Sequence, residues 1–225
     1  MKHMRLLILA LLILISATSI AQTNTKVELT EYIREIQIWH KEQNNMSLAF
    51  WIPKSYWRLA LADSPMVNEQ VLSEIERAFE DYVLVCALDG EIQVNGMMTF
   101  TNKTELSKTI AVIDSDNNNY FPLTNEELSP EALAFSEAIR PMFAQMLGQM
   151  GQGMHFYFFE VKDQQGANVF NEYQKGQFKI KHSNKEFEYK LPLVCLLPSK
   201  KCPVDGAEMK GNWEYCPYHG VELKE

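Results

Sequence analysis

The residues whose types and spacing point to chemistry stand together near the C-terminus, in CPVDGAEMKGNWEYCPYHG (202–220). Two copies of Cys-Pro-x-x-Gly begin at Cys202 and Cys216, 14 positions apart, and their fourth positions are Asp205 and His219. Thiolate, imidazole and carboxylate groups are the ligands that zinc uses in proteins. If the two turns face each other, these four side chains can meet at one metal ion.

This pattern resembles the zinc-ribbon family, in which two such knuckles, each tightened by its Gly, present two ligands apiece to one tetrahedral metal. The resemblance covers about the last 25 residues. It implies a small hairpin over residues 200–225 and a structural zinc site formed by Cys202, Asp205, Cys216 and His219. The family has Cys at the fourth position of each knuckle, whereas this chain has Asp205 and His219 there. A closed four-ligand site leaves no open position for catalysis.

Two other interpretations of the hairpin stay open. Facing knuckles would bring Cys202 and Cys216 together, and an oxidising compartment would favour a disulfide between them. Alternatively, neither link forms and the hairpin is held by packing around Trp213. The remaining cysteines, Cys86 and Cys195, lie in apolar runs, where we expect buried structural thiols.

The N-terminal residues 1–21 have the three-part layout of a secretory signal peptide. Lys2 and Arg5 precede an apolar run over residues 6–15, and Ser19 and Ala21 stand at the −3 and −1 positions of a cut. That run has about half of the roughly 20 residues that a membrane span needs. We therefore expect cleavage after Ala21 and a chain exported to the periplasm or secreted, with an uncleaved anchor as the alternative.

The charge of the chain narrows its expected partners. Removal of residues 1–21 deletes two positive charges and changes the formal net charge from −8 to −10. Nucleic acid and anionic membrane surfaces repel such a chain at long range, so neither is expected as a partner. We expect instead a protein or another component of the cell envelope.

Hydrophobic periodicity predicts a mixture of helices and strands. We expect helices over 30–43, 55–63, 68–82 and 129–147, and strands or hairpins over 46–53, 83–100, 109–123, 154–161, 177–183 and 186–193. Asn68 and Ser129 are predicted N-caps, and Pro141 should kink or split the last helix. Asp89-Gly90 and Asn95-Gly96 are predicted tight turns.

This order of elements, without regular βαβ alternation, predicts an α+β fold. We expect a domain over residues 25–195 in which a mainly antiparallel sheet is covered by helices. A boundary at 198–201 and the zinc-ribbon-like hairpin over 200–225 should follow it.

The sequence shows no catalytic signature. It lacks Gly-x-Ser-x-Gly, and a thiolate at Cys86 or Cys195 would be disfavoured by the apolar surroundings. His40 and His182 lie among charged residues and are predicted to be exposed. We therefore expect a non-enzymatic binding or structural protein of the cell envelope, with a hydrolase whose site is assembled from scattered residues as the alternative. The chain also looks like exported bacterial proteins that end in a CPxxG/CPYHG hairpin, a similarity that implies no activity.

Methionines recur every four residues after the predicted kink, which raises a third possibility. Soft thioethers in an exported protein suggest copper(I) handling, although methionines at helical spacing more often fill a core. Glycines at 148, 151 and 153 are predicted to interrupt the helix before the third methionine, Met150. The methionines concerned are Met142, Met146, Met150 and Met154.

Overall fold

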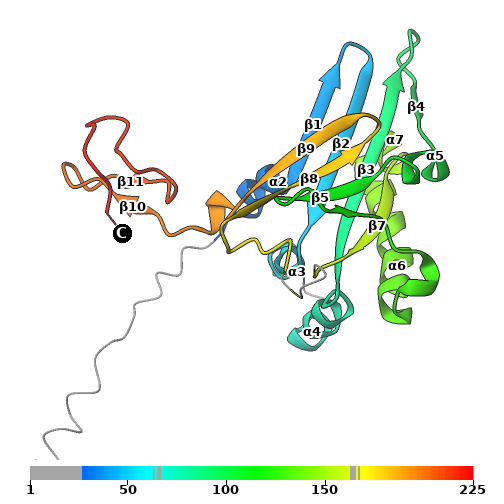
Figure 1. The fold of residues 1–225 in the computed structure, drawn as a ribbon, viewed down its shortest axis with the longest axis horizontal. Helices are drawn as coiled ribbons and strands as arrows, with labels where there is room; N and C mark the ends of the chain where they lie inside the picture. The colour runs from blue at the N-terminus through cyan, green and yellow to red at the C-terminus, as the bar shows by residue number, and fades with distance from the viewer. Residues whose placement is uncertain (1–26, 63, 65–66, 163–165, 167, 225) are drawn as a thin grey trace, which may run out of the picture.

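The computed structural model describes residues 27–62, 64, 67–162, 166 and 168–224 (Figure 1). The predicted signal peptide, residues 1–21, lies outside them. The helices are α2 (Leu29–Ile36), α3 (Lys54–Leu61), α4 (Glu69–Ala78), α5 (Lys103–Ser107), η1 (Asn125–Glu127), α6 (Pro130–Leu147), α7 (Gln149–Gln152) and η2 (Val194–Leu196). The strands are β1 (Gln37–Glu42), β2 (Asn45–Ile52), β3 (Tyr82–Ile92), β4 (Met98–Phe100), β5 (Ala111–Asp114), β6 (Asn119–Tyr120), β7 (His155–Glu160), β8 (Gly176–His182), β9 (Lys185–Leu191), β10 (Lys200–Lys201) and β11 (Glu208–Met209).

The larger sheet has five antiparallel strands, with β2 between β1 and β3. Strand β3 is long enough to pair with two strands along its other edge. Residues 82–87 of β3 pair with β7, and residues 90–92 pair with β4. Every residue of β2 from Met46 to Ile52 is buried. This run, apolar except for Ser47, is typical of a strand that is covered on both faces.

The smaller sheet has four antiparallel strands in the order β6-β5-β8-β9 and crosses the larger sheet (Figure 1). Buried and exposed side chains alternate along β8 and β9, so one face packs inward and the other meets solvent. Between the sheets, the ring of Trp51 lies 4.9 Å from that of Phe178 and 5.8 Å from that of Tyr189. The hydroxyl of Tyr189 donates a hydrogen bond of 2.9 Å to the carbonyl oxygen of Ala49. The main core is thus an aromatic layer between two sheets.

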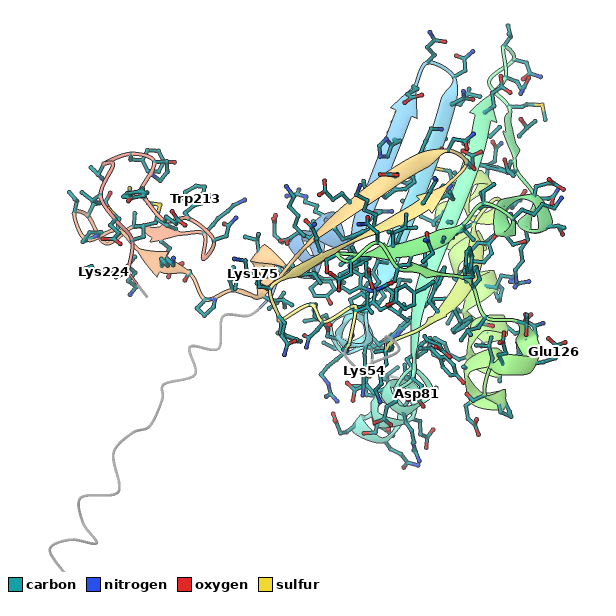
Figure 2. The ribbon with its side chains drawn as sticks, viewed as in Figure 1. Lys54, Asp81, Glu126, Lys175, Trp213 and Lys224 are labelled. Atoms are coloured by element: carbon teal, nitrogen blue, oxygen red, sulfur yellow. The ribbon has the colours of Figure 1, made fainter. Side chains whose placement is uncertain are left out.

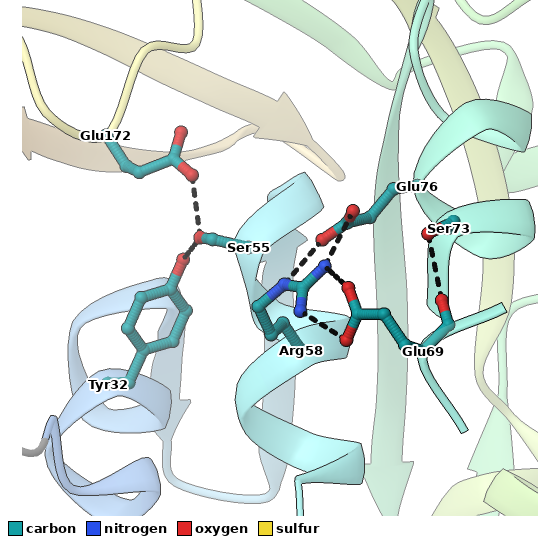
Figure 3. A network of polar contacts seen from close by, with 7 residues as sticks. All are labelled: Tyr32, Ser55, Arg58, Glu69, Ser73, Glu76 and Glu172. Atoms are coloured by element: carbon teal, nitrogen blue, oxygen red, sulfur yellow. Dashed lines mark hydrogen bonds and ion pairs between the residues drawn. The ribbon is translucent and has the colours of Figure 1, made fainter. Parts of the chain in front are cut away.

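Polar side chains connect α2, α3, α4 and the segment that carries Glu172 (Figure 3). Arg58 of α3 donates from Nε to Glu76 at 2.9 Å and from Nη2 to Glu69 at 2.9 Å, which ties α3 to α4. Nearby, Ser55 donates to the Glu172 carboxylate at 2.6 Å, and the Tyr32 hydroxyl lies 2.6 Å from the Ser55 hydroxyl. These contacts join segments that are far apart in the sequence.

The predicted α+β class is confirmed, and so are two predicted caps. Asn68 accepts from the Val71 N–H at 3.0 Å, and Ser129 accepts from the Ala132 N–H at 3.2 Å. Helix α6 is not split at Pro141. Pro141 is exposed, and water can replace the backbone hydrogen bond that a proline removes.

The prediction of one helix over residues 30–43 is wrong for its second half, because residues 37–42 form β1. Strand β2 is buried, so its backbone groups need partners along both edges. Strand β1 supplies them in an antiparallel register that includes Trp39 opposite Leu48. The helix predicted over 68–82 also ends earlier, at Ala78, since β3 begins at Tyr82.

The predicted turn at Asp89-Gly90 is wrong as well. Both residues continue β3, where Gly90 pairs with Met46 on one side and Phe100 on the other. A Cβ atom at Gly90 would lie 2.7 Å from Cδ1 of Phe100, so glycine is required here by close packing. The chain turns instead at Asn95-Gly96, where Gly96 has a φ of 80°.

Among the described helices, none has both the length and the hydropathy that a membrane crossing requires.

Candidate metal centre

The C-terminal hairpin, hereafter the ribbon (residues 200–224), has its own small cluster of buried side chains (Figure 2). Strands β10 and β11 pair antiparallel at its base. The buried residues are Cys202, Met209, Cys216 and Leu223, and Trp213 packs against them. Half of this small core is therefore cysteine.

The two knuckles repeat one pattern of backbone hydrogen bonds. In each, the cysteine N–H donates to the carbonyl five residues later, and the glycine N–H donates back to the cysteine carbonyl. The glycines have positive φ values, 73° at Gly206 and 64° at Gly220, which the turn requires. The bonds are Cys202 to Ala207 at 2.9 Å, Gly206 to Cys202 at 2.8 Å, Cys216 to Val221 at 2.8 Å and Gly220 to Cys216 at 2.8 Å.

The knuckles bring three of the four predicted ligands together. His219 Nδ1 lies 3.4 Å from Cys202 Sγ and 3.5 Å from Cys216 Sγ. The three atoms lie within 4.8 Å of one another. The arrangement is compatible with a metal site or a ribbon, as the knuckle pattern predicts.

The fourth predicted ligand, Asp205, lies beside this group. Its Oδ2 is 3.9 Å from His219 Nδ1, and its Oδ1 accepts the Ala207 N–H at 3.0 Å. The repeated backbone gives Asp205 the same position in the first knuckle that His219 has in the second. Its carboxylate is therefore close to the cluster and held by its own turn.

The electrostatic surroundings of the two ribbon thiols differ. Burial raises the pKa of Cys202, and the nearby Cys216 and Asp205 side chains add to the rise. Burial also opposes ionisation of Cys216, but backbone N–H groups of its knuckle, His219 and Cys202 together lower the Cys216 pKa. Cys216 is thus the thiol that ionises more easily, and a metal ion would need both as thiolates.

All four cysteines are free thiols in the structure. Cys86 is fully buried, as predicted, and burial raises its pKa well above the ordinary value. Cys195 is only half-buried. Burial and the Glu35 carboxylate raise its pKa to about 12, and Glu35 also accepts its N–H at 2.8 Å. Neither thiol is prepared to act as a nucleophile at neutral pH.

The structure also reveals a polar cluster that sequence reasoning missed. Ser47 donates to Asp89 at 2.5 Å and accepts from Lys185 Nζ at 2.8 Å, while Thr101 donates to Asp89 at 3.1 Å. Serine beside such groups resembles an activated nucleophile, but Ser47 is 0% exposed. No substrate can reach Ser47 in this conformation. We therefore interpret the cluster as a structural connection between β2, β3 and β9. The only feature of the sequence that could have indicated this cluster is Ser47, a single polar residue within the apolar run of β2.

The prediction that His182 is exposed is wrong. Its side chain is fully buried and stacks on Phe187, with ring centroids 4.6 Å apart. Nε2 lies 2.9 Å from the Leu48 carbonyl oxygen, to which it donates. Burial lowers the pKa of His182 to about 4. The alternation of charged residues around it marked the exposed face of β8, and His182 belongs to the opposite face.

Two of the four methionines considered for copper belong to the core. Met154 is buried, and Met150 packs against the main core. Gly148 ends α6 with a φ of 57°, so the helix is interrupted before Met150 as predicted. The side chains of Met142 and Met146 lie outside the described parts of the chain.

Comparison with known proteins identified no relative of this chain, so the ribbon is interpreted from its own geometry. The relevant features are the repeated knuckles and the convergence of two sulfur atoms and one nitrogen atom. No protein-family model, no curated protein and no solved structure matches this chain.

Proposed function

We propose that this chain is an exported, non-enzymatic binding protein of the cell envelope whose ribbon is closed by one structural zinc ion. Cys202, Cys216 and His219 are the first three ligands and Asp205 is the fourth. The observation that carries the proposal is the placement of both sulfur atoms at 3.4 and 3.5 Å from His219 Nδ1.

Those separations agree with a tetrahedral zinc site. Zn–S bonds of about 2.3 Å and Zn–N bonds of about 2.0–2.1 Å at tetrahedral angles place sulfur and nitrogen about 3.5 Å apart. The ion would therefore fit between Cys202, Cys216 and His219 with little movement. A carboxylate ligand would lie about 3.4 Å from the nitrogen by the same geometry. The 3.9 Å between Asp205 and His219 shortens to that value by a small rotation of the carboxylate.

A structural role suits the ribbon better than a catalytic one. A fold with four buried side chains gains little from hydrophobic burial, so it needs a metal or a cross-link to hold its shape. Four protein ligands would also leave zinc without a position for substrate. The disulfide alternative requires Cys202 and Cys216 to approach until their sulfur atoms are about 2.05 Å apart.

The other functions considered have less support. A serine hydrolase would need an accessible serine, and Ser47, the serine with the most suggestive partners, is buried. Copper handling would need exposed thioethers, whereas Met150 and Met154 contribute to the core.

Metal analysis and thiol counting on the full chain, purified from its exported location, test the proposal. We expect one zinc per chain, with Cys202 and Cys216 reduced and protected from alkylation until a chelator is added. Cys216→Ser should abolish zinc binding. Cys195→Ser is the matched control, because it removes a thiol that lies outside the cluster, and it should leave the zinc content unchanged.

Three results would reject the zinc site. Metal-free protein with a Cys202–Cys216 cross-link would replace it with the disulfide. Metal-free protein with two reactive thiols would mean that the ribbon is held by side-chain packing and by no link. Full zinc content in Cys216→Ser would place the ion elsewhere. Recovery of the chain from the cytoplasm alone, with residues 1–21 intact, would reject export.

A further inference from the structure

A cavity of about 380 Å³ lies away from the ribbon, between α5, α6, β7 and the segment 121–125. Figure 1 shows α5 and α6 on the same side of β7. Aromatic and aliphatic side chains form much of its wall, among them Leu133, Phe158 and Phe121, which is 69% exposed. Its size is within the range of small-molecule sites.

Two cations, Lys103 and Arg140, line this cavity beside its apolar side chains, and Glu137 is the single carboxylate among its described lining residues. Glu137 pairs with Arg140 within α6 at 3.5 Å, in a contact that is largely exposed. Lys103 forms no ion pair with the described residues. Its Nζ lies 5.9 Å from the centre of the Tyr157 ring, and its carbonyl oxygen accepts the Tyr157 hydroxyl at 3.1 Å.

The two cations give this cavity one positive charge more than Glu137 balances. Partial burial and the nearby Arg140 lower the pKa of Lys103, whereas Glu137 opposes this shift. This happens in a chain whose formal net charge is −8. Local positive charge beside an apolar wall is the chemistry that recognises an amphipathic anion.

We propose that this cavity binds a small amphipathic carboxylate, with its charged group between Lys103 and Arg140 and its apolar body against Phe121, Leu133 and Phe158. The inference gives a ligand class to the binding role proposed above and rests on that role, but it does not depend on the metal. Arg140 would accept the carboxylate through its planar fork and Lys103 as a point charge. The two residues are 37 positions apart in the sequence, so no local motif announces the site.

Paired probes separate the charged group from the apolar body. We would titrate the full-length exported protein by calorimetry with octanoate and octan-1-ol, with 4-phenylbutyrate and 4-phenylbutan-1-ol, and with inorganic phosphate. We expect at least one carboxylate to bind one per chain, at least about tenfold more tightly than its alcohol, because a charge-assisted pair is lost in the alcohol. Phosphate should bind far more weakly than that carboxylate, since it lacks an apolar body.

Variants then locate the site. Lys103→Gln and Arg140→Gln should each weaken binding of that carboxylate about tenfold with an unchanged melting temperature. Lys108→Gln is the matched control, because Lys108 directly follows α5 and pairs with Glu105 at 2.7 Å. It should bind as the unaltered protein does.

Several outcomes overturn the proposal: no binding of either carboxylate, equal binding of acid and alcohol, phosphate binding as tight as the carboxylate, or full affinity in both cavity variants. Zinc content measured on the same samples keeps the two proposals apart. Cys216→Ser should lose zinc and keep carboxylate binding. Lys103→Gln should keep zinc and bind the carboxylate more weakly.

Discussion

The α+β part of the chain and the ribbon differ in what fills their centres. Between the two sheets, Trp51, Phe178 and Tyr189 are almost fully buried within a large hydrophobic cluster. In the ribbon, two of the four buried residues are Cys202 and Cys216. The first centre removes a large apolar area from water, whereas the second contains groups that are able to bind a metal ion or form a disulfide.

This difference teaches where each part obtains its stability. Burial of large aromatic side chains stabilises the α+β part without any bound group. The ribbon has little apolar area of this kind, and we propose that a link between its knuckles, the zinc ion, supplies the missing stability. The two parts should therefore respond to different perturbations, and each prediction below tests that separation.

The largest effect is expected from removal of the proposed zinc ion from the ribbon. Structural zinc contributes on the order of 10 kcal/mol to the folding of small zinc modules, so chelation should unfold the ribbon. Hydrogen exchange should show loss of amide protection over residues 202–224, with protection between the sheets unchanged. Loss of protection in both parts after chelation would break the comparison.

The next largest effect is expected from a cavity between the sheets. Trp51→Ala should lower the free energy of unfolding of the α+β part by about 3–5 kcal/mol, because it removes the large buried side chain that packs on Phe178 and Tyr189. Urea unfolding monitored by near-UV circular dichroism measures the loss, and zinc content should stay at one per chain. Tyr215→Ala, which removes a ribbon side chain that is 59% exposed, is the control and should leave the urea midpoint unchanged.

A pH-dependent effect of similar or smaller size is expected from His182. Burial lowers its pKa in the folded chain to about 4 from an ordinary 6.5, so the unfolded chain binds the proton more readily between these values. Stability contributed by neutral His182 is present above pH 6.5 and is lost as the pH falls toward 4, by at most roughly 3 kcal/mol. Asp89 opposes this shift, whereas Lys185 and His40 add to it.

Comparison with His182→Gln isolates that contribution, because glutamine can still donate to the Leu48 carbonyl but does not titrate. Urea unfolding at pH 7 and pH 4.5 should show a smaller acid loss in the variant. Equal losses in both proteins would mean that carboxylates alone carry the acid sensitivity.

The smallest effect is expected from the Arg58 contacts shown in Figure 3. Arg58→Gln should cost less than about 1 kcal/mol, since the arginine side chain is 46% exposed and solvent screens its pairs with Glu69 and Glu76. Thermal unfolding measures this, with Arg34→Gln as a control for an exposed pair within one helix. A loss above 2 kcal/mol would show that the α+β part also depends on a polar link.

Sequence reasoning succeeded for features encoded over a few neighbouring residues. The caps at Asn68 and Ser129 and the end of α6 at Gly148 follow from local backbone chemistry. It failed where distant partners decide the conformation. Residues 37–42 form β1 because β2 needs an edge partner, and Gly90 continues β3 because Phe100 packs against it.

The two proposed sites divide in the same way. The sequence by itself determined the knuckle pair, because each turn is built from five successive residues whose proline, glycine and cysteine positions define its shape. Only the tertiary structure decided that Cys202, Cys216 and His219 converge, that Ser47 is sealed beside Asp89, and that Lys103 and Arg140 share a cavity. The physical reason is that pairing of strands and packing of helices set distances between residues that sequence spacing leaves free.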